Sequence, residues 1–328
     1  MREFEIVRAY DLPSLFSVLA ENPEAKVIAG GTNLVDLMKL GVERPGTLVD
    51  INGMKELNGI DFTDDGGVII GALTSNSELA WHSQIQSRLP MISQSILAGA
   101  TTQIRNMATV GGNLLQKNRC PYFADTGARC NKRDPGSGCE ALQGANRMCA
   151  VLGVSNKCIA AHPSDLCVAL TALDAVIHAS SSNGARQIPI AEFYKRPGDT
   201  PSVENELGEA ELITAIQIPA LPFAKHSTYA KLRDRKSYAF ALVSVAAAVS
   251  HNNGHIENIR LALGSVGSIP WRAKTAEQLL CGTTPSDKDL RNAAEAVFEE
   301  ATPQSGNAFK IELAQRAIVR VLRELLEA

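Results

Sequence analysis

The sequence lacks the marks of a membrane-spanning, secreted or nucleic-acid-binding protein. No run of 18 apolar residues occurs, so we expect no transmembrane helix. The formal net charge of −3 gives no basic surface that argues for nucleic acid. The first residues, MREFEIVRAYDL, contain no cationic region followed by an apolar region, so we expect no secretory signal on this chain.

An acid–base constellation for catalysis is also missing from the sequence. The six histidines are scattered, and His162 beside Pro163 fits entry into a helix as well as it fits a functional role. We therefore assign no catalytic residue to this chain and expect substrate chemistry on another one. With 328 residues, of which 45% are hydrophobic, the chain has enough material for two domains with cores of their own.

Two glycine pairs each follow an apolar run, at Ala29–Leu34 (AGGTNL) and at Thr109–Leu114 (TVGGNL). A phosphate needs backbone N–H donors that point inward and no side chain in the way, and glycine pairs supply both. A single pair would be taken as an ordinary turn, but two near-copies favour a dinucleotide site. Their spacing matches neither the G-x-G-x-x-G fingerprint nor a Walker A loop, so nicotinamide binding through a Rossmann unit is not supported.

Six of the seven cysteines fall within residues 120–167. Their spacing, C-x9-C-x8-C-x9-C-x8-C-x8-C, is not the C-x2-C of zinc fingers or bacterial ferredoxins. Disulfide frameworks are usual in small secreted domains, and this chain is neither small nor signal-bearing, so a metal or cluster is the better prediction. A loop of about forty residues with little apolar content needs something to hold it, and a 4Fe-4S cluster would do so. The alternative is a loose loop with free thiols.

The residues around these thiols fit a cluster. Lys132, Arg133 and Arg147 are near the cysteines in sequence and would offset the negative charge of a cluster. Cys167 falls inside a predicted helix and is expected to pack there. Cys281 stands alone, and we expect it to be a buried small hydrophobic residue.

Apolar runs and turn residues predict two parts that meet near residue 224, at a joint containing prolines. Pro163 and Ser164 mark the start of a helix that runs into a strand. Beyond the joint, two long apolar segments predict adjacent antiparallel strands, and two helices end the chain. The segments expected to be regular are a strand, turn and helix start at 26–38, strands at 47–51, 67–72, 210–220, 240–250 and 256–267, and helices at 77–98 and from 164.

The chain resembles the FAD-binding medium subunit of the xanthine dehydrogenase family of molybdenum hydroxylases. Four segments carry this resemblance: AGGTNL, QIRNMATVGGNLL, SDLCVALTALDA and KLRDRKSYAFALVSVAAAV. Within that family, CPYFADT, CNKRDPGSGC and CIAAHPSD resemble the FAD subunit of bacterial aldehyde oxidoreductases of the periplasmic type. The resemblance implies an α+β fold with a PCMH or vanillyl-alcohol-oxidase type FAD-binding domain and a C-terminal domain of the CO dehydrogenase flavoprotein type. The implied bounds are 1–224 for the first domain, with subdomains at about 1–57 and 58–224 and an iron–sulfur insertion at about 117–162, and 225–328 for the second.

The resemblance also implies which residues contact FAD. The two glycine loops would hold the pyrophosphate, and Asp165 would accept hydrogen bonds from ribose or ribityl hydroxyls. Lys231 would lie near the flavin ring, and Ile213 would pack on the ring system; a surface salt bridge with Asp234 is the alternative role for Lys231. The full predicted set is Ala29, Gly30, Gly31, Thr32, Asn33, Leu34, Thr109, Gly111, Gly112, Asn113, Asp165, Ile213 and Lys231.

For the cluster, the positions that recur in the family imply Cys120, Cys130, Cys139 and Cys158 as ligands. Relatives with this insertion usually carry His at the position of Cys149, so a ligand role is not required there. Cys149 in place of Cys158 is the alternative fourth ligand.

The implied function is an electron relay. A molybdenum cofactor on a large partner subunit and 2Fe-2S clusters on a small one would deliver electrons to FAD here, and an external acceptor such as a quinone, a ferredoxin or oxygen would receive them. The assembly would be a heterotrimer or its dimer. Alternatives are the flavin subunit of a xanthine dehydrogenase or of an enzyme like 4-hydroxybenzoyl-CoA reductase, a zinc-stabilised scaffold subunit without flavin, and a self-sufficient flavin oxidase. The compartment stays open, since a signal on a partner would allow export to the periplasm.

Overall fold

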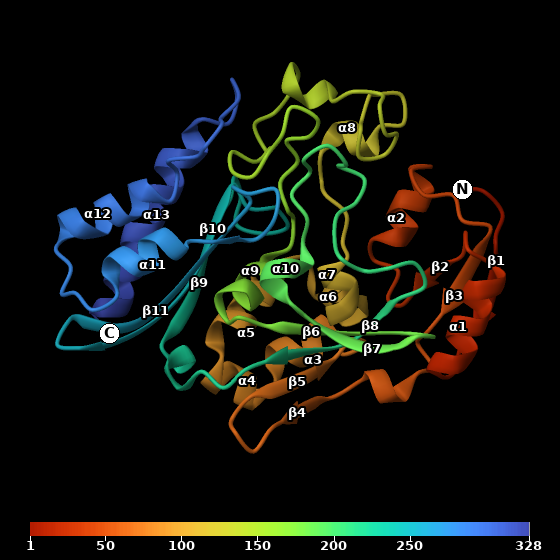
Figure 1. Ribbon diagram of the computed structural model, residues 1–328, viewed down its shortest axis with the longest axis horizontal. Coiled ribbons are helices and arrows are strands. Elements are labelled where there is room, and N and C mark those ends of the chain that lie inside the picture. The colour runs from red at the N-terminus through yellow and green to blue at the C-terminus, as the bar shows by residue number, and fades with distance from the viewer. Residues whose placement is uncertain (328) are drawn as a thin grey trace.

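A computed structural model describes residues 1–327 and contains three β-sheets that follow one another along the chain (Figure 1). The first sheet is small and parallel, with strand order β1-β3-β2. Asp11 caps the helix that follows its first strand, and Leu15 and Phe16 of that helix are buried with Val49. The elements of this part are β1 (Glu5–Arg8), α1 (Leu12–Glu21), β2 (Lys26–Ile28), α2 (Leu34–Lys39), β3 (Thr47–Asp50) and the 3₁₀ turn η1 (Lys55–Leu57).

The second sheet is antiparallel and has the strand order β4-β5-β8-β6-β7. Between its second and third strands in sequence, a run of short helices packs against it and then gives way to the cysteine-rich segment. Its elements are β4 (Ile60–Phe62), β5 (Val68–Gly71), α3 (Asn76–Trp81), α4 (Ser83–Arg88), α5 (Pro90–Leu97), α6 (Thr102–Met107), α7 (Val110–Leu114), α9 (Asp165–Ala172), β6 (Val176–Ser181), β7 (Gly184–Pro189), α10 (Ile190–Phe193) and β8 (Leu212–Ile218).

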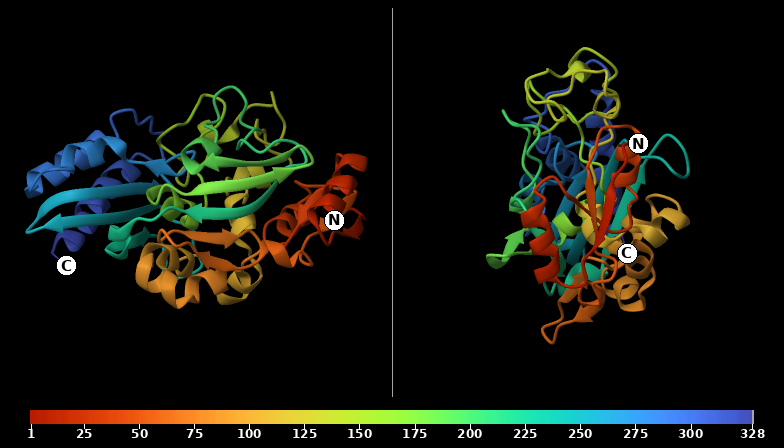
Figure 2. Two further views of the ribbon diagram at one scale, coloured as in Figure 1. Left: turned by 60° about the horizontal axis from the view of Figure 1, so that its bottom comes forward. Right: turned by 90° about the vertical axis from the view of Figure 1, so that its right-hand side faces the viewer.

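The third sheet is antiparallel, with the order β12-β11-β10-β9, and its last helix packs on β10. Ile318, Val321 and Leu322 of that helix are buried, whereas Phe309 at its start is exposed. Figure 2 shows the first and third sheets toward opposite ends of the molecule, with the second between them. The elements are η3 (Pro222–Lys225), β9 (Ser227–Leu232), β10 (Val243–Asn252), β11 (His255–Gly264), β12 (Trp271–Arg272), α11 (Lys274–Leu280), α12 (Asp287–Ala296) and α13 (Phe309–Leu326).

The cysteine-rich segment contains little regular structure beyond α8 (Pro121–Ala124) and η2 (Glu140–Leu142). Hydrogen bonds connect this segment to residues that follow the strands and helices of the third sheet. The backbone N–H groups of Val151 and Leu152 donate to the oxygen of Val266, and the Asn307 side chain donates to the oxygens of Cys149 and Ala150. These bonds fix the path of the segment, and small clusters of buried side chains around Phe123 and around Ala141 and Ile159 add to them.

The predicted strands lie where the sequence placed them, and the two long segments after residue 224 pair as β10 and β11. The segment at 77–98, expected from its length and apolar spacing to form one or two helices interrupted by Pro90, forms three: Pro90 begins α5, and a further break at His82 separates α3 from α4. Ser164 caps α9, and Cys167 is buried inside it, as predicted. Cys281 contradicts its prediction, since it ends α11 at an exposed position and donates its thiol to the oxygen of Glu257.

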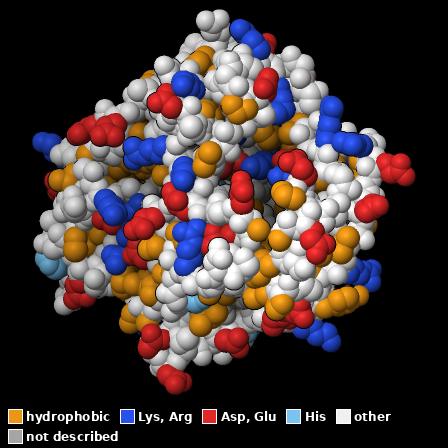
Figure 3. All heavy atoms as spheres, turned by 45° about the vertical axis from the view of Figure 1, so that its right-hand side comes forward, with side chains coloured by type: hydrophobic (Ala, Val, Ile, Leu, Met, Phe, Trp, Pro, Cys, Tyr) orange, Lys and Arg blue, Asp and Glu red, His pale blue; other side chains and the backbone are white. Residues whose placement is uncertain are grey.

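Two further observations concern membrane-spanning helices and the distribution of surface charge. No helix within residues 1–327 is long and apolar enough to cross a membrane. On the face shown in Figure 3, basic and acidic side chains are interspersed.

Candidate functional site

The first glycine loop packs against the chain just before the second loop, and the second packs against Ala72. A Cβ atom on Gly30 would stand 1.7 Å from the backbone oxygen of Met107, and one on Gly111 would stand 3.0 Å from the Cβ of Ala72. Gly31 has a φ of +68°, which favours glycine. The Thr109 hydroxyl accepts a hydrogen bond of 3.2 Å from the N–H of Gly112, and this bond fixes the second loop as it enters α7. Glycine is therefore required at these turns for close approach and for backbone conformation.

Two cavities adjoin at these loops. The Ile213 cavity, about 350 Å³, and the Asp165 cavity, about 400 Å³, are each named here for one lining residue. Thr32, Asn33 and Gly112 line both. Every residue predicted to contact FAD lines at least one of these cavities. Asn113, Asp165 and Lys231 line the Asp165 cavity, and Ile213 and the other predicted residues of the two loops line the Ile213 cavity. The two cavities therefore share part of their wall, at the glycine loops.

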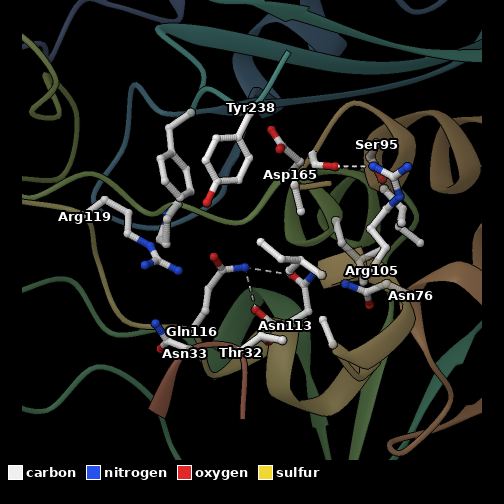
Figure 4. A pocket seen from close by; sticks show the side chains of 18 of the residues that line it. Thr32, Asn33, Asn76, Ser95, Arg105, Asn113, Gln116, Arg119, Asp165 and Tyr238 are labelled. Atoms are coloured by element: carbon white, nitrogen blue, oxygen red, sulfur yellow. Dashed lines mark hydrogen bonds between the residues drawn. The ribbon is translucent and has the colours of Figure 1, made fainter. Parts of the chain in front are cut away.

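Three buried polar atoms that have no partner in the described residues belong to residues that line the Asp165 cavity. These are Nδ2 of Asn33, Oδ1 of Asn76 and Nε of Arg105, whose residues all line that cavity (Figure 4). A buried polar atom left unpaired costs about 1–3 kcal/mol. A polar ligand in the cavity would supply the missing partners, so the residues fit a cofactor with phosphate and hydroxyl groups.

Asp165 and Lys231 form a buried ion pair at the wall of this cavity. The Lys231 ammonium lies 2.7 Å from the carboxylate and also donates to the oxygen of Ala98, and only 4% of its side chain is exposed. The second carboxylate oxygen accepts a bond of 2.5 Å from the Tyr229 hydroxyl. The alternative pairing of Lys231 with Asp234 is wrong, because Asp234 lies 2.8 Å from Arg147 instead.

An aromatic segment borders the same cavity. Tyr238 and Phe240 are both exposed, and the guanidinium of Arg119 lies 5.0 Å from the centre of the Phe240 ring. Burial lowers the pKa of Arg119. Figure 4 shows Tyr238 at the top of the view with its hydroxyl pointing into the cavity, and Arg119 beside it on the left.

Sequence reasoning missed several residues at this site. Tyr229 lines neither cavity but binds Asp165, and it could have been found because it lies two residues before Lys231 on the same face of β9. Asn76 and Arg105 carry no pattern that singles them out, since only the packing of α3 against α6 brings them to the cavity.

The four predicted cluster ligands line one small cavity, of about 10 Å³, which we call the cysteine cavity. Cys130 and Cys139 face each other in an isolated antiparallel bridge, and Lys132 also lines the cavity. Burial raises the pKa of Cys158 to about 11. Within residues 1–327, however, no three His, Cys, Asp or Glu side chains are close enough to hold a metal ion as they stand.

Cys149 is not among the residues that line this cavity. It packs with Cys120 and Cys139, and the interaction between its thiol and that of Cys120 lowers the pKa of Cys120 to about 6 and raises that of Cys149. Its backbone oxygen is bound by Asn307. The position of Cys149 is therefore that of a neighbour to the predicted ligands.

Comparisons with known proteins cover nearly the whole chain. The FAD binding domain of molybdopterin dehydrogenase matches residues 2–221, and the CO dehydrogenase flavoprotein C-terminal domain matches residues 227–325. The chain is 48% identical over 307 residues to the aldehyde oxidoreductase FAD-binding subunit PaoB of Escherichia coli K12, covering 92% of each protein. It is 30% identical to the glyceraldehyde dehydrogenase medium chain of Sulfolobus acidocaldarius, covering 92% of this chain and 90% of the other.

Solved structures share the fold. A chain of quinoline 2-oxidoreductase from Pseudomonas putida 86 superposes with a TM-score of 0.77 at 22% identity, covering 100% of this chain and 98% of the other. A chain of carbon monoxide dehydrogenase from Hydrogenophaga pseudoflava gives a TM-score of 0.76 at 24% identity, covering 98% and 96%. The α+β architecture expected from the sequence is thereby confirmed.

Proposed function

The chain belongs to the family of FAD-binding medium subunits of the molybdopterin dehydrogenases, and from this premise we propose that it is the electron-transfer subunit of a molybdenum-dependent aldehyde oxidoreductase. The carrying observation is the similarity to an aldehyde oxidoreductase subunit along 92% of the chain. A xanthine dehydrogenase subunit is the alternative within the family; the FAD-binding subunit of that enzyme from Escherichia coli O157:H7 is 27% identical over 327 residues.

The two glycine loops would hold the pyrophosphate of FAD, and the close packing at Gly30 and Gly111 leaves no room there for larger residues. The N–H groups of Gly111 and Gly112 already bind the Ala72 oxygen and the Thr109 hydroxyl, so the backbone donors would come from the first loop. Asn33 and Asn76 would bind polar groups with their free amide atoms. Asp165 would accept from cofactor hydroxyls, and Lys231 would hold positive charge beside the cofactor. Bound FAD supplies a group that takes up electrons singly or in pairs.

A 4Fe-4S cluster on Cys120, Cys130, Cys139 and Cys158 is the second part of the proposal. Their shared cavity and the Lys132 ammonium at its wall support it. Because the thiols do not converge closely enough as they stand, the proposal includes rotation of these side chains around the cluster. The segment is already fastened by backbone bonds to the third-sheet region, so the cluster is not its only support.

The remaining parts of the proposal concern partners and domains. A large subunit with the molybdenum cofactor and a small subunit with 2Fe-2S clusters would complete a heterotrimer or its dimer; relatives named as medium chains support a multi-subunit assembly. We place the domain boundary at 224, with subdomains at about 1–57 and 58–224, which keeps each sheet within one part.

The test is the content of iron, acid-labile sulfide and flavin in the anaerobically purified chain. We expect about four irons and about one FAD per chain. FAD without iron would contradict the cluster and leave a flavoprotein subunit, and zinc in its place would favour a zinc site. Neither cofactor in a folded sample with its partners present would overturn the proposal. Aldehyde turnover by the isolated chain would favour a self-sufficient oxidase instead.

A further inference from the structure

The two glycine loops differ in the backbone donors that they can offer to a ligand. In the second loop, the N–H groups of Gly111 and Gly112 already bind protein atoms. In the first loop, the N–H groups of residues 30–33 have no backbone partner within the described part of the chain. Backbone donors are neutral, so a cation beside this loop would add a stronger, charge-assisted contact to the negatively charged pyrophosphate of FAD.

Lys117 brings a cation to this place. It lines the Ile213 cavity together with residues of both glycine loops. Its backbone N–H donates to Oδ1 of Asn33, 2.9 Å away, and Asn33 lines both cavities. The other end of the same amide, Nδ2, is buried and has no partner among residues 1–327. Lys117 is therefore fixed beside the wall that the two cavities share, next to a free donor.

The positive charge of Lys117 is only partly balanced. Glu204 accepts from the ammonium of Lys117 with one oxygen and from that of Lys132, at 2.9 Å, with the other. Two positive charges and one negative charge leave this group with a formal charge of +1. The Lys117 side chain is 34% exposed, and its ammonium has further donors beyond the one that Glu204 accepts.

Other lysines that line the two cavities are less suited to a pyrophosphate at the loops. Lys231 is paired with Asp165, which balances its charge one to one. Lys26 begins β2, and at about 3.3 Å per residue the extended chain places it roughly 13 Å from Gly30. Lys117 combines a partly balanced charge with a backbone bond to a residue of the first glycine loop.

We propose that Lys117 is a phosphate-binding residue of the FAD site, and that Glu204 is the positioning residue that holds its ammonium at the cavity wall. The inference rests on the proposed function, since it requires FAD in the adjoining cavities. Phosphate oxygens would accept from the free donors of the ammonium, and a bond between two charged groups is about twice as strong as one between neutral groups. Lys117 would thus favour a flavin that carries phosphate over one that does not.

The experiment measures the dissociation constants of FAD and of riboflavin, which lacks phosphate, by equilibrium dialysis with the full chain after removal of bound flavin. We expect Lys117→Met to weaken FAD binding about tenfold or more and to leave riboflavin binding unchanged. With one ionic contact missing, the FAD dissociation constant of the variant should also rise less steeply with salt than that of the wild type. Lys117→Arg keeps the charge and should restore most of the affinity.

The matched control is Lys195→Met. Lys195 also pairs with a glutamate, Glu206 at 3.0 Å, its side chain is 39% exposed, and it lines neither cavity. This variant should bind FAD as the wild type does. If Lys117→Met does not fold, Lys117→Gln is compared in the same way, and if riboflavin binds too weakly to measure, the salt dependence of FAD binding decides.

The outcomes separate the inference from the proposed function. A wild-type chain that binds no FAD contradicts the proposed function. FAD binding by the wild type that is unchanged in Lys117→Met overturns the inference alone. An equal loss of FAD and riboflavin binding also overturns it, because Lys117 would then only stabilise the fold of the site.

Discussion

Gly30 and Met107 meet so closely that a Cβ atom on the glycine would stand 1.7 Å from the methionine's backbone oxygen. Gly30 belongs to the loop after β2, and Met107 ends α6 just before the second glycine loop. The neighbouring atom is backbone and cannot rotate away. The two loops therefore reach their positions around the cofactor site only with glycine at position 30.

Replacing Gly30 with alanine tests this contact. Because the backbone must shift, we expect Gly30→Ala to lose most bound FAD and to lower the free energy of unfolding by about 1–3 kcal/mol. Flavin absorbance per chain and denaturant unfolding measure the two effects. Gly46→Ala is the control, since a Cβ there meets nothing within 4 Å. Equal flavin content in the two variants would contradict the assigned role of the loop contact.

The Asp165–Lys231 pair predicts a second result. Asp165→Asn leaves a buried ammonium without its counter-charge, and Lys231→Met leaves the carboxylate with only Tyr229 as a side-chain partner. We expect each variant to lose about 3–5 kcal/mol of stability, and the double variant to lose less than the sum. Denaturant unfolding of all four forms measures the coupling.

The control for this cycle is the exposed pair of Glu312 and Arg316, whose side chains are 68% and 76% exposed. Glu312→Gln should cost less than about 1 kcal/mol. Additive losses at Asp165 and Lys231 would show that the two residues act separately.

How far the sequence predicts this site depends on the range of the interactions. The glycine loops, the Ser164 cap and the strands after residue 224 follow from local rules, because turns, caps and alternation depend on neighbouring residues. The partner of Lys231 did not follow. Asp234 is three residues away in sequence, but Asp165, 66 residues away, is the one that β9 and α9 bring into contact.

Ion pairs between residues far apart in sequence, and the exposure of single side chains, could not be predicted from local patterns either. Glu204 binds a lysine 87 residues away and another 72 residues away, and no local pattern marks either pair. Cys281 was expected to be buried because free cysteine usually is, yet its position at the end of α11 exposes it. The four cysteines of the cavity were identified through family resemblance, since their spacing alone specifies no metal.

The fourth cluster ligand gives a third prediction. Cys158 lines the cysteine cavity, whereas Cys149 does not, so we expect Cys158→Ala to lose most iron and Cys149→Ala to keep about four irons per chain. Iron analysis after anaerobic purification measures this. Cys167→Ala is the control, because Cys167 is a buried thiol within α9. Iron lost from the Cys149 variant and kept by the Cys158 variant would reverse the assignment.

A fourth prediction concerns acid stability. Desolvation lowers the pKa of His162 to about 3, and its ring packs edge-on against that of Tyr194 at 4.5 Å between centres. The imidazole is therefore neutral in the folded chain, while in the unfolded chain it takes up a proton below about pH 6.5. Since the unfolded state then binds more protons, the free energy of unfolding falls as the pH falls. His162 alone should remove about 2 kcal/mol between pH 7 and pH 5.

Urea unfolding of wild type and His162→Phe at several pH values between 7 and 5 isolates this contribution. Phenylalanine keeps an aromatic ring against Tyr194 but cannot take up a proton, so the variant should lose clearly less stability over that range. His255→Phe makes the same substitution at an exposed position and should follow the wild-type curve. Parallel curves for wild type and His162→Phe would mean that His162 is protonated in the folded chain as readily as in the unfolded one, and the desolvation inferred from its packing would then be wrong.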